Sequence, residues 1–312
     1  MALKLVFCGT PEFAVPSFQA LLEAGHDVPL VVTQPDKPVG RKAEMQAPPV
    51  KRAAEAHGIP VIQPEKIKQN EGFRQQLERI RPDAIIVVAY GRIIPKWMLE
   101  LPRFGNINLH GSLLPKYRGA APIQWAVANG ETVTGVTTMR LDEGLDTGPM
   151  LLAEKQWIAP EETAADLFES LADIGAKLMV KTLHGLDCGT VTPVEQNHLE
   201  ATQAPILKRE DGLIDFSRTA QQIYNRWRGF QPWPGAYTTL RGKKFIAHAL
   251  KPAHAVTASP GELIGDAGRL FVGCADGTAI ELLEVQAEGK RRMTAAEFLR
   301  GFQVRSGERL GR

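Results

Sequence analysis

The chain has 312 residues, of which 44 % are hydrophobic and 23 % are charged, a composition typical of a soluble protein with two domains. Its three cysteines stand far apart, with no CxxC pair or His/Cys cluster, so we expect no metal site and no disulfide framework. The N-terminal apolar run is too short for a signal peptide, and no stretch reaches the roughly 18 apolar residues of a membrane span, which predicts a cytoplasmic protein that does not engage a membrane.

The net charge of +2 is distributed unevenly along the chain. From Leu207 onward there are 17 Lys and Arg against 11 Asp and Glu, a net charge of +6, whereas residues 1–206 carry 20 against 24, a net charge of −4. A basic C-terminal third indicates a polyanionic partner, and chance unevenness is the alternative explanation.

The first half of the chain alternates short apolar runs with helical patterns. Thr163 and Asp166 form a capping box that begins the last of these helices. The expected strands are 3–7, 28–33, 61–62, 84–88, 106–110, 133–141 and 150–157, and the expected helices are 13–22, 51–57, 73–80, 122–128 and 163–184. This alternation predicts an α/β domain with a Rossmann-like, mostly parallel sheet, whose ligands bind at the carboxyl ends of the strands.

Nucleotide binding is disfavoured in spite of this fold class. The first turn, Cys8-Gly9-Thr10-Pro11, has one glycine instead of a GxGxxG pattern, and the sequence has no Walker motif. A long polar connection, residues 34–50, follows the second expected strand and contains four prolines and a glycine. Connections of this length are usually functional or disordered.

The C-terminal part of the chain has a different pattern. Periodicity is lost between Gly185 and Pro205, so we divide the chain into domains at 1–189 and 207–312 with a linker at 190–206. Ser217 is expected to cap a helix that runs through Trp227, and a Thr-x-x-Glu box is expected to cap a last helix at Thr294. Between them the expected strands are 237–240, 244–250, 261–264, 270–273 and 278–286, with a hairpin signal at Asp276-Gly277. Short strands with a basic balance predict a small β-barrel of OB type.

Polar residues gather at the end of one expected strand. Asn106, Asn108 and His110 alternate in the stretch 106–110, so their side chains share one face, and Gly111 follows. A lone histidine there would more simply satisfy a turn, but an Asn-x-His-Gly sequence at a strand end favours a functional site. Asp146 lies between Gly144 and Gly148 in a second polar loop and is either a turn residue or part of the same site.

These stretches resemble a known family. NLHGSLLPKYRGAAPIQWA, residues 108–126, resembles the signature of the 10-formyltetrahydrofolate-dependent formyltransferases, and LDEGLDTGPM, residues 141–150, resembles their second motif. FCGTPEFAVPSFQALL near the N-terminus and IYNRWRGFQPWPGAY at the start of the second domain are similar to the branch that acts on methionyl-tRNA. The resemblance covers essentially the whole chain. It implies a formyltransferase catalytic domain followed by a tRNA-binding domain, initiator methionyl-tRNA as partner, 10-formyltetrahydrofolate as co-substrate, and a monomer.

The resemblance also implies roles for particular residues. The catalytic trio is expected to be Asn108, His110 and Asp146. Asn108 and His110 would stabilise the oxyanion that forms when the amine attacks the formyl carbon, and Asp146 would hold His110 and a water for proton transfer. The folate is expected to contact Tyr90, Gly91, Arg92, Ile93, Ile94, Ser112, Leu113, Leu114, Pro115, Leu141 and Asp142. Ile93 and Ile94 are equally compatible with a place in the hydrophobic core.

The tRNA contacts are expected in two places. Arg41 and Lys42 lie in the long connection, which we expect to be mobile until it orders against the acceptor stem. In the second domain the candidates are Arg241, Lys243, Lys244, Arg291 and Arg292.

Four alternatives to this function are open. Formyltransferases that act on a purine precursor have a glycine- and serine-rich first turn, which CGTPEF is not. A sugar-nucleotide formyltransferase and a formyltetrahydrofolate hydrolase are further enzymes, although a hydrolase would leave the basic C-terminal third unexplained. A non-catalytic RNA-binding protein built on an inactive domain would not need an intact Asn-x-His with its aspartate.

Overall fold

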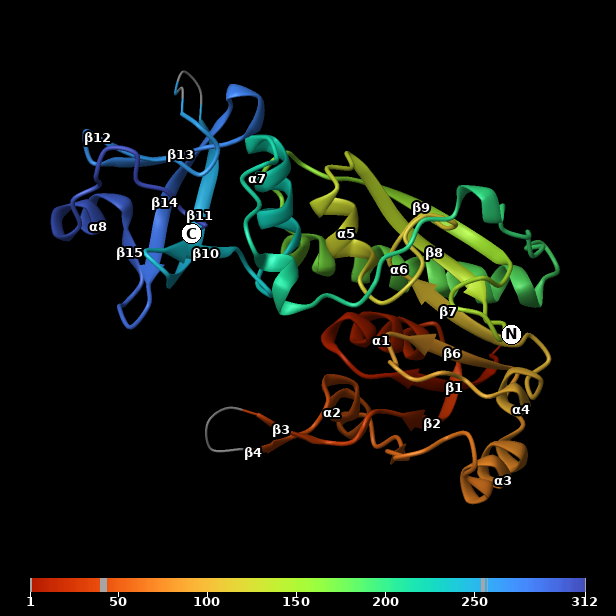
Figure 1. The fold of residues 1–312 in the computed structure, drawn as a ribbon. Helices are drawn as coiled ribbons and strands as arrows, with labels where there is room; N and C mark the ends of the chain where they lie inside the picture. The colour runs from red at the N-terminus through yellow and green to blue at the C-terminus, as the bar shows by residue number, and fades with distance from the viewer. Residues whose placement is uncertain (1, 40–43, 254–255, 257, 312) are drawn as a thin grey trace. The chain divides into compact units, whose positions relative to one another are not determined.

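The computed structural model describes residues 2–39, 44–253, 256 and 258–311. The chain divides into two compact units (Figure 1). The first unit consists of Met1–Pro122, Val133–Trp157 and Phe168–Pro205, and the second consists of Ile123–Thr132, Ile158–Leu167 and Ile206–Arg312.

The first unit is built on a sheet that has seven strands within the described residues. Its order is β5 (Val61–Ile62), β2 (Asp27–Val32), β1 (Lys4–Gly9), β6 (Ala84–Val88), β7 (Asn106–His110), β8 (Val133–Arg140) and β9 (Met150–Trp157). The first five run parallel, whereas β8 and β9 are antiparallel to their neighbours. The expected α/β fold with a mostly parallel sheet is therefore confirmed. Because β1 lies between β2 and β6, the strand order reverses there, which places a ligand site near the carboxyl ends of the central strands.

Helices cover both faces of this sheet. In the first unit they are α1 (Val15–Glu23), α2 (Pro49–Ala56), α3 (Glu71–Ile80), the single turn α4 (Lys96–Leu99) and most of α6 (Ala164–Asp187), whereas α5 (Pro122–Ala128) belongs almost wholly to the second unit. On one face Val6 and Val87 join a core cluster with Phe73 of α3 and Met98 of α4. On the other face Phe7 packs against Phe18 of α1.

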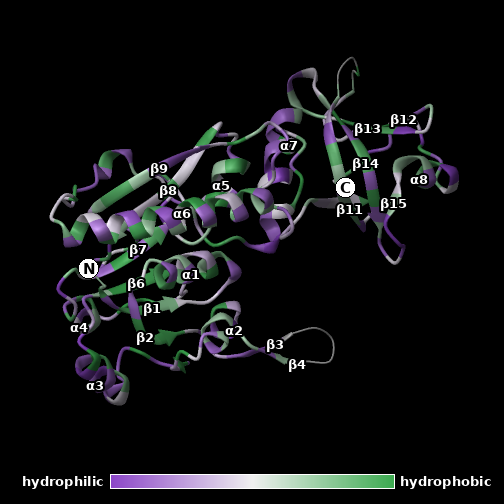
Figure 2. Ribbon diagram, turned by 180° about the vertical axis from the view of Figure 1, so that it is seen from behind, coloured by the Kyte–Doolittle hydropathy of each residue, from purple (hydrophilic) through white to green (hydrophobic). Residues whose placement is uncertain are grey.

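Successive side chains of β7 point to opposite faces of the sheet. Leu109 points toward α6, where a Cβ on Gly175 would lie only 2.4 Å from a Leu109 methyl group, so the helix and strand approach closely because this position is glycine. Asn106, Asn108 and His110 have the opposite parity and belong to the face of α3 and α4. The central strands β1, β2 and β6 are predominantly hydrophobic along their length (Figure 2).

Two features of the first unit differ from the expected elements. The turn α4 was not expected, because four residues are too few to show periodicity. The long connection contains an antiparallel pair, β3 (Lys37–Val39) and β4 (Glu44–Gln46), which is too short for a strand pattern to stand out among its prolines. Arg41 and Lys42 lie outside the described residues.

The second unit is an antiparallel sheet with α7 (Ala220–Gly229) and α8 (Ala295–Gly301). Its strand order is β10 (Tyr237–Leu240), β11 (Lys243–Ala253), β14 (Ala279–Ala287), β13 (Arg269–Gly273) and β12 (Leu263–Asp266), with β15 (Met293–Thr294) paired to β14. The C-terminal segment reaches both edges, because Leu310 bridges to Leu240 and Arg309 bridges to Glu262. Asp276 and Gly277 both have positive φ in the turn between β13 and β14, as the hairpin signal requires.

Helix α7 begins two residues later than expected. Thr219, not Ser217, is its N-cap, because Gln222 stands three residues after it and completes a capping box. The Ser217 hydroxyl instead donates to Asp215 at 2.6 Å, so the expected cap at Ser217 is wrong. The boxes expected at Thr163 and Thr294 are confirmed by reciprocal hydrogen bonds with Asp166 and Glu297. None of the described helices is long and apolar enough to cross a membrane.

Candidate active site

The two asparagines of β7 have different environments although they share a face. Asn106 is fully buried, and its side-chain amide donates to the carbonyl of Met98 at 2.7 Å, which ties the strand to α4. Asn108 is 8 % exposed, and its amide has no hydrogen-bond partner among the described residues. A polar side chain at the rim of a core usually has a partner, so Asn108 is the member of the pair that is available to a ligand.

His110, at the end of β7, is held by the main chain of the following turn. Its ring is 5 % exposed, and Nε2 lies 2.8 Å from the carbonyl oxygen of Tyr117. A carbonyl only accepts, so this contact places a proton on Nε2 and leaves Nδ1 as the ring nitrogen that can act elsewhere. Tyr117 makes the contact from a left-handed conformation, with φ of 61°.

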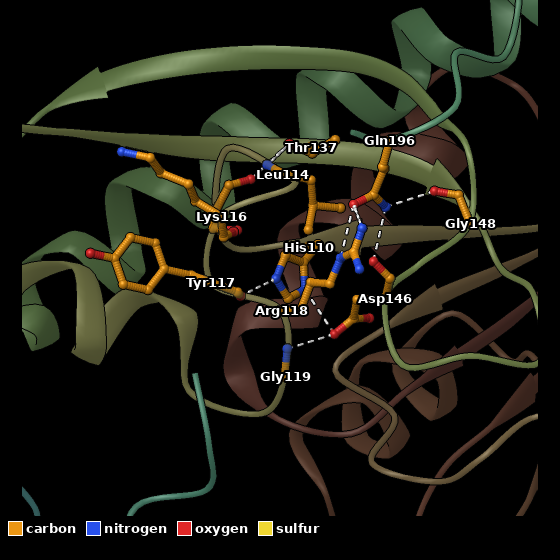
Figure 3. Close-up of polar contacts among 11 residues, drawn as sticks. His110, Leu114, Lys116, Tyr117, Arg118, Gly119, Thr137, Asp146, Gly148 and Gln196 are labelled. Carbon is orange, nitrogen blue, oxygen red and sulfur yellow. Dashed lines mark hydrogen bonds and ion pairs between the residues drawn. The ribbon is translucent and has the colours of Figure 1, made fainter. Parts of the chain in front are cut away.

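Asp146 meets His110 from the loop between β8 and β9. Its Oδ2 lies 3.7 Å from Nδ1 of His110, a separation too long for a hydrogen bond but short enough for charge attraction whenever the ring is protonated (Figure 3). The same Oδ2 accepts the N–H of Gly119 at 2.9 Å. Gly119 has φ of 120°, and a Cβ there would lie 2.6 Å from the carbonyl oxygen of Ala204, so only glycine can deliver this N–H.

The structure thus brings Asn108, His110 and Asp146 to one place. Sequence patterns indicated these three residues, but they gave no sign of two further ones, Arg118 and Gln196. These two are 5 % and 4 % exposed and are hydrogen-bonded to each other, and Gln196 is also hydrogen-bonded to the Asp146 loop. Gln196 belongs to the stretch where periodicity is lost, so no local signal could have pointed to it.

The loop after β6 contains the first group of expected folate contacts. The carbonyl oxygens of Tyr90 and Gly91 accept from the Gln34 side chain at 3.1 Å, and the Tyr90 carbonyl also accepts from Thr10. The phenol of Tyr90 is buried in the core, and burial raises its pKa. Arg92 donates to the carbonyl of Glu65.

The two neighbouring isoleucines have opposite environments. Ile94 is 8 % exposed and belongs to the core cluster, whereas Ile93 is 90 % exposed. A large apolar side chain that projects from an otherwise well-packed loop suits the face of an aromatic ligand. Ile93 is therefore the stronger candidate for contact with folate.

The second group of expected folate contacts lies in two segments, the turn directly after His110 and the loop that carries Asp146. Ser112 donates to the carbonyl of Lys116, and the N–H of Leu114 donates to Thr137 of β8, so residues 112–115, including Leu113 and Pro115, form a tied turn. In the other loop the N–H of Leu141 donates to the carbonyl of Asn106. The Asp142 carboxylate accepts from Thr147 and Gly144 and shapes the loop that carries Asp146.

The expected tRNA contacts of the second unit divide into paired and unpaired side chains. Arg241, Arg291 and Arg292 form ion pairs with Glu308, Glu297 and Glu284 respectively. Lys243 is exposed, and the ammonium group of Lys244 lies 4.9 Å from the centre of the Tyr237 ring. Within the described residues neither lysine forms an ion pair. The described residues also contain no group of His, Cys, Asp and Glu arranged to hold a metal.

Comparisons with known proteins agree along the whole chain. Residues 3–183 match the model of the formyl transferase family, and residues 206–303 match the model of the formyl transferase C-terminal domain. A methionyl-tRNA formyltransferase of Acidobacterium capsulatum is 64 % identical over 99 % of this chain and 100 % of its own length. One from Koribacter versatilis is 60 % identical over 99 % of this chain and 98 % of its own.

Solved structures show the same fold at low identity. An N-formyltransferase of Helicobacter canadensis in complex with folinic acid and dTDP-3-aminofucose has a TM-score of 0.66 at 19 % identity, over 92 % of this chain and 100 % of its own. HypX of Aquifex aeolicus in complex with tetrahydrofolic acid has a TM-score of 0.63 at 17 % identity, over 96 % of this chain and 47 % of its own.

Proposed function

The chain belongs to the formyl transferase family, in its methionyl-tRNA formyltransferase branch, and from this premise we propose that Asn108, His110 and Asp146 carry out the transfer. The reaction moves the formyl group of 10-formyltetrahydrofolate to the free amino group of methionyl-tRNA and leaves tetrahydrofolate. The product, N-formylmethionyl-tRNA, serves translation initiation. The observation that carries the assignment of residues is the Asp146–His110 pair, with the unpartnered amide of Asn108 on the same strand face.

Asn108 and His110 stabilise developing negative charge. When the amine attacks the formyl carbon, the carbonyl oxygen becomes an oxyanion, and fixed donors aimed at that oxygen lower the barrier. The Asn108 amide needs to break no internal hydrogen bond before it donates. The His110 ring is fixed through Nε2 by the Tyr117 carbonyl, so Nδ1 is the ring nitrogen left for the reaction, and it donates to the oxyanion when the ring carries a second proton.

Asp146 orients His110 and accepts the proton that the attacking amine loses. Its Oδ2 is already fixed by the Gly119 N–H, while Oδ1 has no partner among the described residues. We assign to Oδ1 the role of accepting the proton of the attacking amine, directly or through a water, for delivery to N10 of the leaving folate. An α-amino group titrates near 8, so a large share of the nucleophile is already neutral at cellular pH.

The loops around the trio fit the folate donor. Ile93 offers an exposed apolar face, and the main chain of 90–94 and 141–146 offers polar groups to the edge of a pterin ring. The carbonyls of Tyr90 and Gly91 already accept from Gln34, so their role is to fix this loop. Bound at these loops, the donor would supply the activated formyl group.

The same reasoning extends to the setting of the reaction. We assign the enzyme to the cytoplasm, where its tRNA substrate is made and used, with initiator methionyl-tRNA as that substrate. A monomer suffices, because Asn108, His110 and Asp146 all belong to the first unit of one chain.

An Asp146→Asn variant tests the assignment. Asparagine tolerates the left-handed conformation of Asp146 (φ of 52°) and still accepts the Gly119 N–H, so only the charge and the proton acceptor are removed. We expect kcat for formylation of methionyl-tRNA to fall by about 100-fold or more with little change in KM. Asp173→Asn, at an exposed position on α6, is the control and should behave as wild type. Normal turnover of Asp146→Asn would remove the carboxylate from proton transfer.

A further inference from the structure

A buried pair of side chains connects two segments that lie far apart in the sequence. Arg118 follows the turn that fixes His110, and Gln196 lies 78 residues later, after α6. The guanidinium donates from Nε and from one terminal nitrogen to Oε1 of Gln196, at 3.0 and 2.7 Å. It also donates to Nδ1 of His198 at 3.1 Å. Among the described residues no carboxylate forms an ion pair with Arg118.

The other end of the Gln196 amide holds the loop that carries Asp146. Its nitrogen donates to the carbonyl of Asp146 at 2.9 Å and to the carbonyl of Gly148 at 2.7 Å (Figure 3). Arginine can only donate and carbonyls can only accept, so the chemistry of the partners fixes the orientation of the amide. Both polar atoms of the Gln196 side chain are therefore hydrogen-bonded, the oxygen to Arg118 and the nitrogen to the loop that carries Asp146.

The loop needs such support because Asp146 has an unusual backbone. Its φ of 52° lies in the left-handed region, which is uncommon for a residue with a side chain even though Asp tolerates it better than most. The Gly119 N–H fixes the carboxylate, and the Gln196 amide fixes the carbonyl of the same residue. Tyr117, Arg118 and Gly119 are consecutive, so one short turn positions the His110 ring, the Asp146 carboxylate and, through Gln196, the Asp146 main chain.

We propose that Arg118 and Gln196 are positioning residues for formyl transfer, and that they act by holding Asp146 in the orientation that faces His110. This inference rests on the proposed role of Asp146 in the reaction. A buried cation partnered by a neutral amide is a costly way to stabilise a fold, which agrees with a role in orientation. Displacement of a catalytic group by about 1 Å can cost on the order of 100-fold in rate.

Gln196→Glu removes the donor atom of the Gln196 amide and keeps its acceptor atom. The carboxylate keeps an acceptor for Arg118, but it places an oxygen where the amide nitrogen donated to the carbonyls of Asp146 and Gly148. We expect kcat for formylation to fall by about 10- to 100-fold, with both KM values within about twofold of wild type. Gln203→Glu is the matched control, because it makes the same substitution at an exposed side chain of the same segment, and it should leave kcat unchanged.

A cycle with Asp146→Ala shows whether Gln196 acts through Asp146. In the Asp146→Ala background, Gln196→Glu should cause no further loss of kcat, a result that a general weakening of the fold would not produce. Gln196→Met, of similar volume and without charge, should lose as much turnover as Gln196→Glu and replaces it if the glutamate variant does not fold.

The outcomes distinguish a failure of the proposed function from a failure of the positioning role of Gln196. If the wild type does not formylate methionyl-tRNA, or if Asp146→Ala keeps its turnover, the proposed function of the site is wrong. If both behave as expected but a folded Gln196 variant keeps wild-type kcat, or if the losses in the double variant simply multiply, the positioning role is overturned.

Discussion

Asn106 and Asn108 are two residues apart on one face of one strand, and their surroundings assign them opposite tasks. Asn106 is fully buried and donates to the carbonyl of Met98, so its amide stabilises the fold. Asn108 reaches the rim, where its amide has no partner among the described residues. The Asn106 amide is therefore committed to the fold, whereas the Asn108 amide is free to donate to the substrate oxygen that we propose it stabilises.

Alanine at each position should separate stability from turnover. Asn108→Ala removes a donor that makes no internal bond, so kcat should fall by about 100-fold or more while the thermal midpoint stays close to that of wild type. Asn106→Ala should lower the free energy of unfolding by about 1 to 3 kcal/mol and change kcat much less. Formylation kinetics and thermal unfolding of both variants provide the comparison. If Asn108→Ala lost stability but kept turnover, its amide would be a structural group.

For single residues, the sequence pointed to those that stand in a distinctive local pattern and missed those that do not. Asn108 and His110 were predicted because strand alternation and a following glycine place both on one face of a strand end, and their roles stay a prediction. Gln196 could not be found, because its partners Arg118 and Asp146 are 78 and 50 residues away and its own segment has no periodicity. A contact of that kind exists only after the chain has folded.

The long connection in which tRNA contacts are expected contains the β3–β4 pair. At its base Asp36 accepts from Lys51 at 3.0 and 2.8 Å and from Gln63 at 2.7 Å, and these hydrogen bonds, that from Lys51 foremost, hold the pKa of the Asp36 carboxyl below its usual value. Gln63 also donates to the carbonyl of Gln34. The base of the β3–β4 pair is therefore well anchored. Arg41 and Lys42, which lie outside the described residues, stay predicted tRNA contacts.

Arg41→Ala should weaken productive contact with tRNA and leave the folate site alone. Loss of one phosphate contact reduces attraction to the RNA, so we expect KM for methionyl-tRNA to rise about 3- to 10-fold, or kcat to fall by a similar factor. KM for 10-formyltetrahydrofolate should stay within about twofold of wild type. Lys68→Ala removes the same charge from an exposed position in the first unit and serves as control. Unchanged tRNA kinetics would remove the hairpin from the mechanism.

Elements with a regular period were predicted most successfully. The ranges 84–88, 106–110, 122–128 and 150–157 agree with β6, β7, α5 and β9 residue for residue. The turn α4 and the β3–β4 pair were missed, because they contain too few residues for a period to show. The start of α7 was misplaced because Ser217 and Thr219 are both good caps, and the partner Gln222 decides between them.

At the scale of the whole molecule, the positive charge of the C-terminal third is partly neutralised within the second unit. Of the five candidate cations, Arg241, Arg291 and Arg292 are paired with glutamates. Lys243 and Lys244 form no ion pair within the described residues and are the better candidates for phosphate contacts. An OB-type sheet that carries such cations suits a nucleic-acid strand.

A Lys243→Ala/Lys244→Ala variant should bind tRNA more weakly and with less dependence on salt. Each phosphate contact releases counterions, so losing two should reduce the slope of log affinity against log salt by about 1 to 2. Titration of labelled tRNA at several salt concentrations measures this slope. Arg291→Ala, which removes a cation already paired with Glu297, should change it less. Equal slopes for wild type and the double variant would place tRNA recognition elsewhere.

The most direct test of the whole account is the stoichiometry between tetrahydrofolate release and formylation. The wild-type chain is supplied with 10-formyltetrahydrofolate, first alone and then with initiator or elongator methionyl-tRNA, and both products are measured. We predict one tetrahydrofolate released for each formylmethionyl-tRNA formed, with the initiator strongly preferred and release close to zero without tRNA. Release that continues at the same rate without tRNA would identify a hydrolase, and the absence of formylmethionyl-tRNA would contradict the account.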